Sequence, residues 1–336
     1  MKVFGVIRQD TGVGAYRIGQ PVQFINNVEK EQSRITPFTG QNVPVRISEG
    51  LNRPTWTDEM LMESSKDADI IFSNVLTSQD EILKMLDLRK WSGAKWVVDI
   101  DDNIYAVTSD NPASKNTQAF YRNFELCLSL ADGVTVSVPY LKEIYRNLNK
   151  NIFVNPNGID FSIWKPQKRR HKGLRVGWRG AYGHRGDILS AQPALEKVYD
   201  IDLVSFGVKP PFKTEHHEWV PFLKYADHLA SLELDVAVVP LVDNAYNKGK
   251  SNLAILEYSA LKIPVIASPT ENQKDMPILY AKTNYEWFEA LKKMKDKDFR
   301  KEQAKKQYDF VRKNYDMKVL TPPLIDFFKN LERKKL

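Results

Sequence analysis

Short apolar runs alternate with stretches of helical spacing along most of the chain. In the first half the apolar runs are "KVFGVI", "ADIIFSN", "KWVVDI", "GVTVS" and "NIFVNPNG". Between them, "EILKMLDLRKW" and "FYRNFELCLSLA" place apolar residues three and four positions apart, which predicts amphipathic helices. Buried strands that alternate with helices are typical of parallel sheets built from βαβ units. The pattern therefore predicts an α/β fold.

The second half repeats this scheme. Its predicted strands are "LRVGWRG", "IDLVSFG", "HEWVPF", "LDVAVVPL" and "IPVIAS", and its predicted helices are "DILSAQPALEKVY", "YADHLASLE" and "SNLAILEYSAL". Residues 159–173, "IDFSIWKPQKRRHKG", interrupt the pattern with a proline and a run of charge, so we expect an interdomain linker there. The expected organisation is two Rossmann-like domains, residues 1–165 and 173–310, and a helical segment, residues 311–336.

Length and composition narrow the class of protein. A length of 336 residues suits two domains of roughly 150 residues each. The net charge of +7 favours anionic partners, although a solubilising basic surface accounts for it equally well. The start, "MKVFGVIRQD", turns polar too soon for a signal peptide, Cys127 is the single cysteine, and no apolar run reaches the roughly 18 residues of a membrane span. We therefore expect a cytoplasmic protein.

The residues that can carry chemistry fall where predicted strands end, which is where open parallel sheets bind ligands. Gly12 and Gly14 follow the first strand, and glycines there let backbone amides approach a phosphate closely. An ordinary tight turn explains the pair as well, and the third glycine of the dinucleotide fingerprint is missing.

Three carboxylates close the strand in "VVDIDDN": Asp99, Asp101 and Asp102. Asp99 and Asp101 form a D-x-D pair, a pattern that can hold a divalent metal on a nucleotide diphosphate. The alternative is that the carboxylates hydrogen-bond the following loop. We expect them to be functional but not to bind a metal, because the second half of the chain carries a fuller nucleotide site.

The first part of that site is "RVGWRGAYGHRGD". Glycines, Gly180 among them, frame Arg179, His184 and Arg185 between a strand and a predicted helix. Flexible backbone, a helix N-terminus and guanidinium groups together suit an anion such as phosphate. A mobile basic loop is the alternative interpretation.

The second part is "NKGKSNLAILEYSAL". Ser251 or Asn252 is a good N-cap, and Lys248 and Lys250 lie beside the first turn, so this helix start predicts a second anion site.

Glu257 lies on that helix, away from the predicted apolar stripe of Leu253, Leu256 and Ala260. A carboxylate there can accept hydrogen bonds from a sugar diol, as an acidic residue does in dinucleotide folds. The alternative is a surface glutamate with no ligand. In either case its removal is expected to leave the fold intact.

Several of these stretches, in this order along the chain, resemble signatures of family 4 glycosyltransferases of GT-B architecture: "LADGVTVSVPYLKEI", "VNPNGID", "RVGWRGAYGHRGD", "VAVVPLVDNAYNKGKSN" and "KSNLAILEYSALKIPVIAS". The resemblance implies two Rossmann-like domains that face each other across a cleft, with the final helix crossing back to the first domain. It implies a retaining hexosyltransferase that uses a nucleotide diphosphate sugar, UDP-sugar above all, with no obligatory metal or other cofactor.

The resemblance also assigns donor-binding roles. Glu257 matches the glutamate that binds the donor ribose, Lys250, Ser251 and Asn252 match the loop and helix start that hold the diphosphate, and Arg179 matches the basic residue opposite them. Gly180 and His184 complete the predicted donor site. The family often carries another glutamate where this chain has Gly249, which leaves the identity of the sugar open.

On the acceptor side, Asp101 and Asp102 match groups near the acceptor and the reacting sugar. Arg179 and Lys250 would stabilise the charge that develops on the leaving diphosphate, so these four residues form the predicted catalytic set. The predicted acceptor cleft consists of Gly12, Gly14, Tyr16, Arg17, Asp99 and Asn103.

The acceptor itself stays open between two classes. If the acceptor is a hydroxymethylated base in DNA, as in viral glycosyltransferases, the cleft needs a rim of basic residues. If it is a cell-surface or lipid-linked glycan, binding would depend on aromatic residues such as Tyr16 and Tyr105. Two alternative functions also stay open: a metal-dependent transferase, and a non-catalytic module that only binds a nucleotide sugar. The rim candidates are Arg17, Arg122, Lys168, Arg169 and Arg170.

Overall fold

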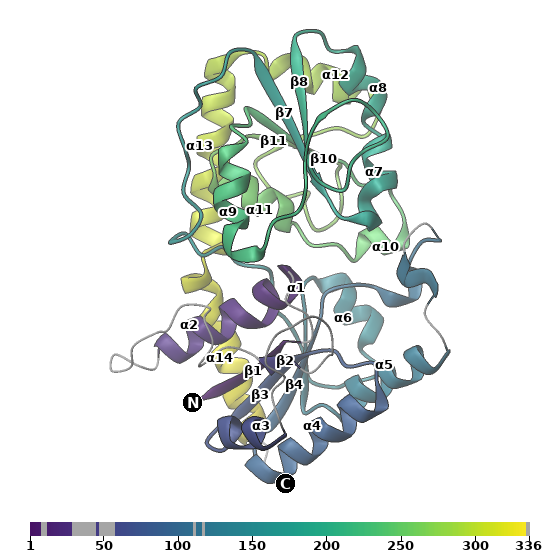
Figure 1. Cartoon of the computed structure of the whole chain (residues 1–336), viewed down its shortest axis with the longest axis vertical. Helices are drawn as coiled ribbons and strands as arrows, with labels where there is room; N and C mark the ends of the chain where they lie inside the picture. Colours follow the sequence, from purple (N-terminus) through teal and green to yellow (C-terminus); the bar gives the residue numbers. More distant parts are fainter. Residues whose placement is uncertain (8–11, 29–44, 47–57, 110–111, 116–117, 334–336) are drawn as a thin grey trace. The chain divides into compact units, whose positions relative to one another are not determined.

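A computed structural model describes residues 1–7, 12–28, 45–46, 58–109, 112–115 and 118–333 (Figure 1). The chain divides into two compact units. Unit 1 comprises residues 1–102, 115–157 and 317–336, and unit 2 comprises residues 103–114 and 158–316. Each unit is built around a parallel sheet of six strands.

The sheet of unit 1 contains, from edge to edge, β2 (Val45–Arg46), β1 (Val3–Ile7), β3 (Ile70–Asn74), β4 (Lys95–Ile100), β5 (Gly133–Val136) and β6 (Ile152–Val154). All of its neighbouring strands run parallel. The chain winds from β1 to β2 in one direction and from β3 to β6 in the other, as in a doubly wound fold.

The helical segments of unit 1 are α1 (Gly12–Gly14), the π-helix η1 (Ala15–Gly19), α2 (Gln20–Val28), α3 (Asp58–Ser65), α4 (Gln79–Ser92), α5 (Gln118–Leu130), α6 (Pro139–Tyr145) and α14 (Met317–Arg333). One core joins β1, β3 and β4 to η1, α2 and α14, and Ile18, Val22 and Phe328 are buried in it. The last helix of the chain therefore packs on the sheet of unit 1, where Phe328 lies edge-on to Phe72 with ring centroids 5.4 Å apart.

The sheet of unit 2 contains, from edge to edge, β12 (Leu279–Tyr280), β11 (Val265–Ala267), β10 (Val236–Val239), β7 (Leu174–Gly180), β8 (Ile201–Gly207) and β9 (Glu215–His217). These strands are also parallel throughout. The winding direction reverses between β7 and β10. Loops after those two strands diverge at that point, which creates the usual ligand position of an open α/β sheet.

The helical segments of unit 2 are η2 (Ile104–Ala106), η4 (Tyr182–His184), α7 (Arg185–Leu189), α8 (Gln192–Lys197), α9 (Phe222–Ser231), α10 (Ala245–Lys248), α11 (Leu253–Ala260), α12 (Asn284–Lys293) and α13 (Lys297–Tyr315); the short η3 (Pro112–Lys115) spans the boundary between the units. Helices α7, α8 and α12 cover one face of the sheet, and α9, α11 and α13 cover the other (Figure 1). Trp178, Ile188, Leu195 and Trp287 are buried on the first face.

The fold class predicted from the sequence, two Rossmann-like units of parallel sheet and helices, is confirmed. Two element predictions are wrong in detail. The strand expected at "HEWVPF" is Glu215–His217, displaced toward the N-terminus, and "DILSAQPALEKVY" forms two short helices instead of one. Pro193 explains the break, because a proline in the first turn cannot continue a preceding helix.

The boundaries of the two units also differ from the expected ones. The segments 103–114 and 158–165, expected in the first domain, cluster with unit 2, and the final helix begins at Met317. Among the described helices, none has the length and apolar content that would let it cross a membrane.

Candidate functional site

A buried ion pair joins the end of β7 to α11 in unit 2. Nη2 of Arg179 lies 2.6 Å from Oε2 of Glu257, and the hydroxyl of Tyr225 donates to the same oxygen at 3.1 Å. Glu257 is only 1% exposed. The sequence prediction that it lies on an open flank is therefore wrong, because α11 is enclosed by the sheet on one side and by α13 on the other.

The protonation states of this cluster follow from burial. Burial, reinforced by the carboxylate of Glu257, raises the pKa of Tyr225 well above its ordinary value. Burial also raises the pKa of the neighbouring Tyr258. Both phenols stay protonated at neutral pH, so Tyr225 is a permanent hydrogen-bond donor to Glu257. Sequence reasoning missed Tyr225, since a tyrosine on an amphipathic helix carries no sign of what it contacts.

The start of α11 is the second component of the site. Asn252 is the N-cap residue by position, its Nδ2 donates to Sδ of Met276 at 3.5 Å, and the amide of Leu253 donates to Oγ of Ser251 at 3.4 Å. The ammonium of Lys250 lies 4.3 Å above the ring of Tyr246. The partial positive charge of the helix N-terminus and the Lys250 cation thus occur together, which favours an anion.

Asp187 ties the loops of the site to one another. Its Oδ1 accepts hydrogen bonds from the amide of Val242 at 2.9 Å and from Nδ2 of Asn247 at 2.7 Å. Its Oδ2 lies 2.8 Å from Nδ1 of His184. Asp187 therefore fixes the segment after β10 and orients the predicted donor residue His184. The sequence marked Asp187 only as the opening of a helix.

Replacing Asp187 with Ala is expected to destabilise unit 2. The change leaves the Val242 amide and one N–H of the Asn247 side chain without their acceptor, while the other N–H keeps its bond to the Val242 carbonyl oxygen. Each buried donor left unpaired costs about 1–3 kcal/mol. Chemical denaturation measures the loss. Asp243→Ala, on an exposed residue of the same loop, is the matched control and should change stability little. Equal stability of the two variants would contradict this role for Asp187.

The ends of β7 and β8 are shaped by aromatic side chains that the sequence did not reveal as a group. A side chain at Gly180 would collide with the indole of Trp178, and one at Gly207, whose φ is +99°, would collide with Trp219. Trp219 packs on Phe206 with ring centroids 5.0 Å apart, yet it remains 43% exposed. Part of the Trp219 side chain is therefore exposed near the carboxyl end of β8.

In unit 1 two of the predicted cleft residues, Arg17 and Asp99, belong to a buried structural cluster. The guanidinium of Arg17 donates to both carboxylate oxygens of Asp99, at 3.0 and 2.7 Å, and to the carbonyl oxygen of Asn155 at 2.7 Å. Thr135 donates to Asp99 at 2.5 Å. Burial by itself lowers the pKa of Arg17, but the adjacent Asp99 carboxylate outweighs burial and raises it, so the side chain is a permanent cation.

This burial corrects two sequence predictions. Arg17 is 1% exposed and Tyr16 is 3% exposed, because η1 packs directly against the sheet. Arg17 therefore cannot belong to a basic rim, and Tyr16 cannot stack on a glycan. Asp99 is occupied by Arg17, so the expected D-x-D pair does not present two available carboxylates. Within the described residues, no group of three or more His, Cys, Asp and Glu side chains is placed to hold a metal ion.

Asp101, Asp102 and Asn103 are consecutive in the sequence, but the two aspartates belong to unit 1 and Asn103 belongs to unit 2. The carbonyl oxygens of Asp101 and Asp102 accept hydrogen bonds from Ser137 at 3.3 Å and from Tyr145 at 2.7 Å, and both aspartates are partly exposed. Asn103 is buried in unit 2, where its Nδ2 donates to the carbonyl oxygen of Ala245 at 3.3 Å. Gly12 has open space around its Cα, whereas Gly14 is buried.

Comparison with known proteins places the fold. No protein-family model and no curated protein sequence matches this chain. Among solved structures, sucrose-phosphate synthase from Thermosynechococcus elongatus matches with a TM-score of 0.70 at 13% identity over 100% of both chains. HepE of Anabaena in complex with UDP-glucose matches with a TM-score of 0.66 at 10% identity, over 98% of this chain and 100% of the other.

A third similar structure is an α-glucosyltransferase in complex with UDP and a 13-mer DNA containing an HMU base. Its TM-score is 0.66 at 11% identity, over 97% of this chain and 98% of the other. These neighbours are GT-B glycosyltransferases, so the chain has the GT-B fold that the sequence resemblance predicted.

Proposed function

We propose that this protein is a glycosyltransferase that takes a UDP-sugar donor in unit 2. The observation that carries the proposal is the Arg179–Glu257 ion pair, because it joins the carboxyl end of β7, at the switch point of the sheet, to the helix whose start carries Lys250. The GT-B fold supports the same conclusion, as do the complexes of HepE with UDP and with UDP-glucose.

In this proposal donor binding exchanges the partners of the ion pair. In the structure the Glu257 carboxylate is paired with Arg179 and accepts a hydrogen bond from the Tyr225 hydroxyl. The diphosphate offers Arg179 a new anionic partner, which leaves Glu257 to accept from the ribose diol. The exposed indole of Trp219 offers a stacking surface for the uracil.

The chemical step would then rest on fixed positive charge. Negative charge grows on the diphosphate as its bond to the sugar breaks, and Arg179, Lys250 and the N-terminus of α11 stabilise it without a metal. We assign Asp101 and Asp102 to the acceptor side of the site. The reaction we propose transfers a hexose with retention of configuration, as the sequence resemblance implies.

Calorimetric titration with UDP and with uridine tests the donor site, and incubation with a panel of UDP-sugars tests the chemistry. We expect UDP to bind far more tightly than uridine, and one UDP-sugar to be hydrolysed or transferred. Failure to bind UDP would overturn the proposal. Binding of a UDP-sugar without any turnover would instead favour a non-catalytic binding module.

Lys250→Ala is expected to lower kcat by about 10²-fold while leaving uridine affinity unchanged, because removing one preorganised positive group from a developing anion costs this much in other enzymes. Steady-state kinetics with the best UDP-sugar measure the change. Lys248→Ala, two residues away and exposed, is the matched control and should retain kcat. An equal effect of both substitutions would argue against a specific role of Lys250.

For the acceptor, the α-glucosyltransferase bound to DNA with an HMU base is the specific observation that favours a hydroxymethylated base in DNA over a glycan. Arg122 is exposed and remains available to contact phosphates, while Tyr105, 48% exposed, remains available to a glycan. Lys168 and Arg170 are also exposed but belong to the segment before β7, away from the donor end of the sheet. Transfer assays on DNA with hydroxymethylated pyrimidines and on neutral oligosaccharides decide between them. Transfer to oligosaccharide alone would exclude DNA as the acceptor.

A further inference from the structure

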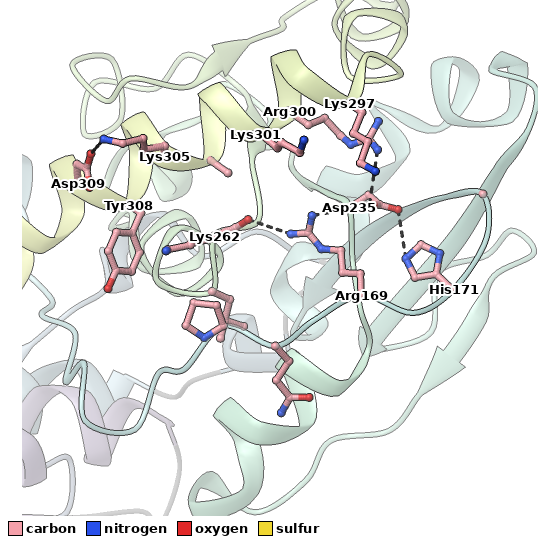
Figure 2. A pocket seen from close by; sticks show the side chains of 15 residues that line it. Arg169, His171, Asp235, Lys262, Lys297, Arg300, Lys301, Lys305, Tyr308 and Asp309 are labelled. Atoms are coloured by element: carbon pink, nitrogen blue, oxygen red, sulfur yellow. Dashed lines mark hydrogen bonds and ion pairs between the residues drawn. The ribbon is translucent and has the colours of Figure 1, made fainter.

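A groove lined by charged side chains lies at the opposite end of the unit 2 sheet from the donor site. It has a volume of about 780 Å³ and runs between α13, the segment 166–173 and the turn after α11 (Figure 2). Gly173, Asp235 and Lys262 line it, and they immediately precede or approach the starts of β7, β10 and β11. At about 3.3 Å per residue, the length of β7 separates this groove from Arg179 by about 20 Å.

The lining of the groove is strongly basic. Two carboxylates, Asp235 and Asp309, face six cationic side chains and one histidine, His171. The cations come from three separate parts of the chain, which the fold brings together: Arg169, Lys262, Lys297, Arg300, Lys301 and Lys305.

The inner end of the groove holds more positive charge than its carboxylate can balance. Arg169, Arg300 and His171 all point toward Asp235, at 3.7, 3.8 and 3.3 Å (Figure 2). Burial lowers the pKa of Arg169 and outweighs the Asp235 carboxylate, which raises it; the positive charge of Arg300 also lowers it. An anion bound between the two guanidinium groups would relieve this repulsion, and guanidinium groups suit bidentate contact with phosphate.

The outer wall is a row of cations along α13. Lys297, Lys301 and Lys305 are exposed and lie about one helical turn apart, so they extend over about 12 Å. Lys301 pairs with Asp298 at 3.1 Å and Lys305 with Asp309 at 2.6 Å, both in exposed ion pairs that a phosphate can replace. Each strand of a nucleic-acid duplex carries one phosphate per about 3.4 Å of axis, so the row is long enough to meet about three or four phosphates. The exposed Lys168 and Arg170 continue the basic segment at the opposite wall.

We propose that this groove binds the phosphodiester backbone of a double-stranded nucleic acid, without sequence preference. A row of this length exceeds what a single phosphate group occupies, and cations on two facing walls fit a charged strand better than the flat surface of a membrane. The site anchors nucleic acid about 20 Å from the donor site, at the distance that the length of β7 sets. This proposal stands apart from the donor chemistry, because it uses none of the donor residues.

Fluorescence anisotropy of a labelled DNA duplex of mixed sequence, titrated with the full-length protein, tests the groove. With about four phosphates neutralised, binding should weaken by about 10²-fold between 50 and 200 mM salt, because each contact releases counterions. No measurable binding at low salt would overturn the proposal.

The variant Lys297→Ala/Lys301→Ala/Lys305→Ala should weaken binding and reduce the slope of log K against log salt by about 2.7, at 0.9 per lost contact. Lys84→Ala/Lys90→Ala/Lys142→Ala, on exposed residues of α4 and α6, removes the same charge elsewhere and should keep the slope. Equal weakening of both triple variants would show that binding depends on overall charge, and would overturn the proposal that the groove is the binding site.

Two further measurements distinguish a nucleic-acid groove from a membrane contact and from a general loss of folding. Vesicles containing phosphatidylserine should bind more weakly than DNA; a groove that binds vesicles and not DNA would belong to a membrane contact and contradict the proposal. UDP affinity and the melting temperature of the α13 variant should match wild type. Because UDP binding is measured separately, failure of the donor site and failure of the groove are distinguishable.

Discussion

Replacing Glu257 with Ala is expected to abolish measurable UDP binding and also to destabilise unit 2. Removing one partner of a buried ion pair leaves an uncompensated charge and costs about 3–5 kcal/mol; the lower end applies here, because Arg179 remains 16% exposed. The buried hydroxyl of Tyr225 loses its acceptor as well. Urea denaturation and UDP calorimetry measure the two effects independently.

The double variant Glu257→Ala/Arg179→Ala provides the control. It removes both charges, so its loss of stability should be smaller than the sum of the two single losses, whereas UDP binding should remain absent. Glu257→Gln, which keeps the acceptor for Tyr225, should be more stable than Glu257→Ala. Wild-type UDP affinity in Glu257→Ala would refute the donor-site assignment, and strictly additive stabilities would refute the coupling of the pair.

Arg17→Ala is expected to lower the free energy of unfolding by about 3–5 kcal/mol, because it leaves Asp99 charged and buried without its partner. Both side chains are 1% exposed, and Arg17 connects the end of β4 to the segment after β6. Thermal or urea unfolding measures the loss.

Arg122→Ala is the matched control for this prediction. Both arginines are rim candidates on sequence grounds, but Arg122 is exposed on α5, so its removal should change stability little. UDP affinity of the Arg17 variant should persist at temperatures at which the protein stays folded, since the donor residues belong to unit 2. A variant as stable as Arg122→Ala would show that the Arg17–Asp99 pair does not hold unit 1 together.

The sequence predicted the elements of the sheets well, because a strand buried on both faces must be apolar along its whole length. "KWVVDI" and "LRVGWRG" form β4 and β7 at the positions their composition indicates. It failed at "HEWVPF", where aromatic residues pack around Tyr225 and Phe206 and do not continue a strand. Apolar content alone cannot distinguish a buried strand from an irregular segment whose aromatic side chains pack against neighbouring elements.

The sequence also identified Arg179, Glu257 and the start of α11 as a candidate site, since residues at the ends of parallel strands converge on one edge of a sheet. It could not give their environment. Whether Glu257 is exposed depends on α13, which begins forty residues later and covers α11. The same holds for Arg17. Arginine is usually found on protein surfaces, but the contacts with Asp99 and Asn155 bury this one.

By itself, then, the sequence determined the α/β class, the two-unit plan and the loops that we propose as the nucleotide-sugar site, because these follow from local periodicity and from residue types at strand ends. Only the tertiary structure decided which charges are buried in pairs and which remain available. It also created the basic groove, whose cations come from segments 166–173, 261–262 and 297–309 and carry no common motif. Burial and the balance of charge depend on contacts between residues distant in sequence, and no local pattern encodes them.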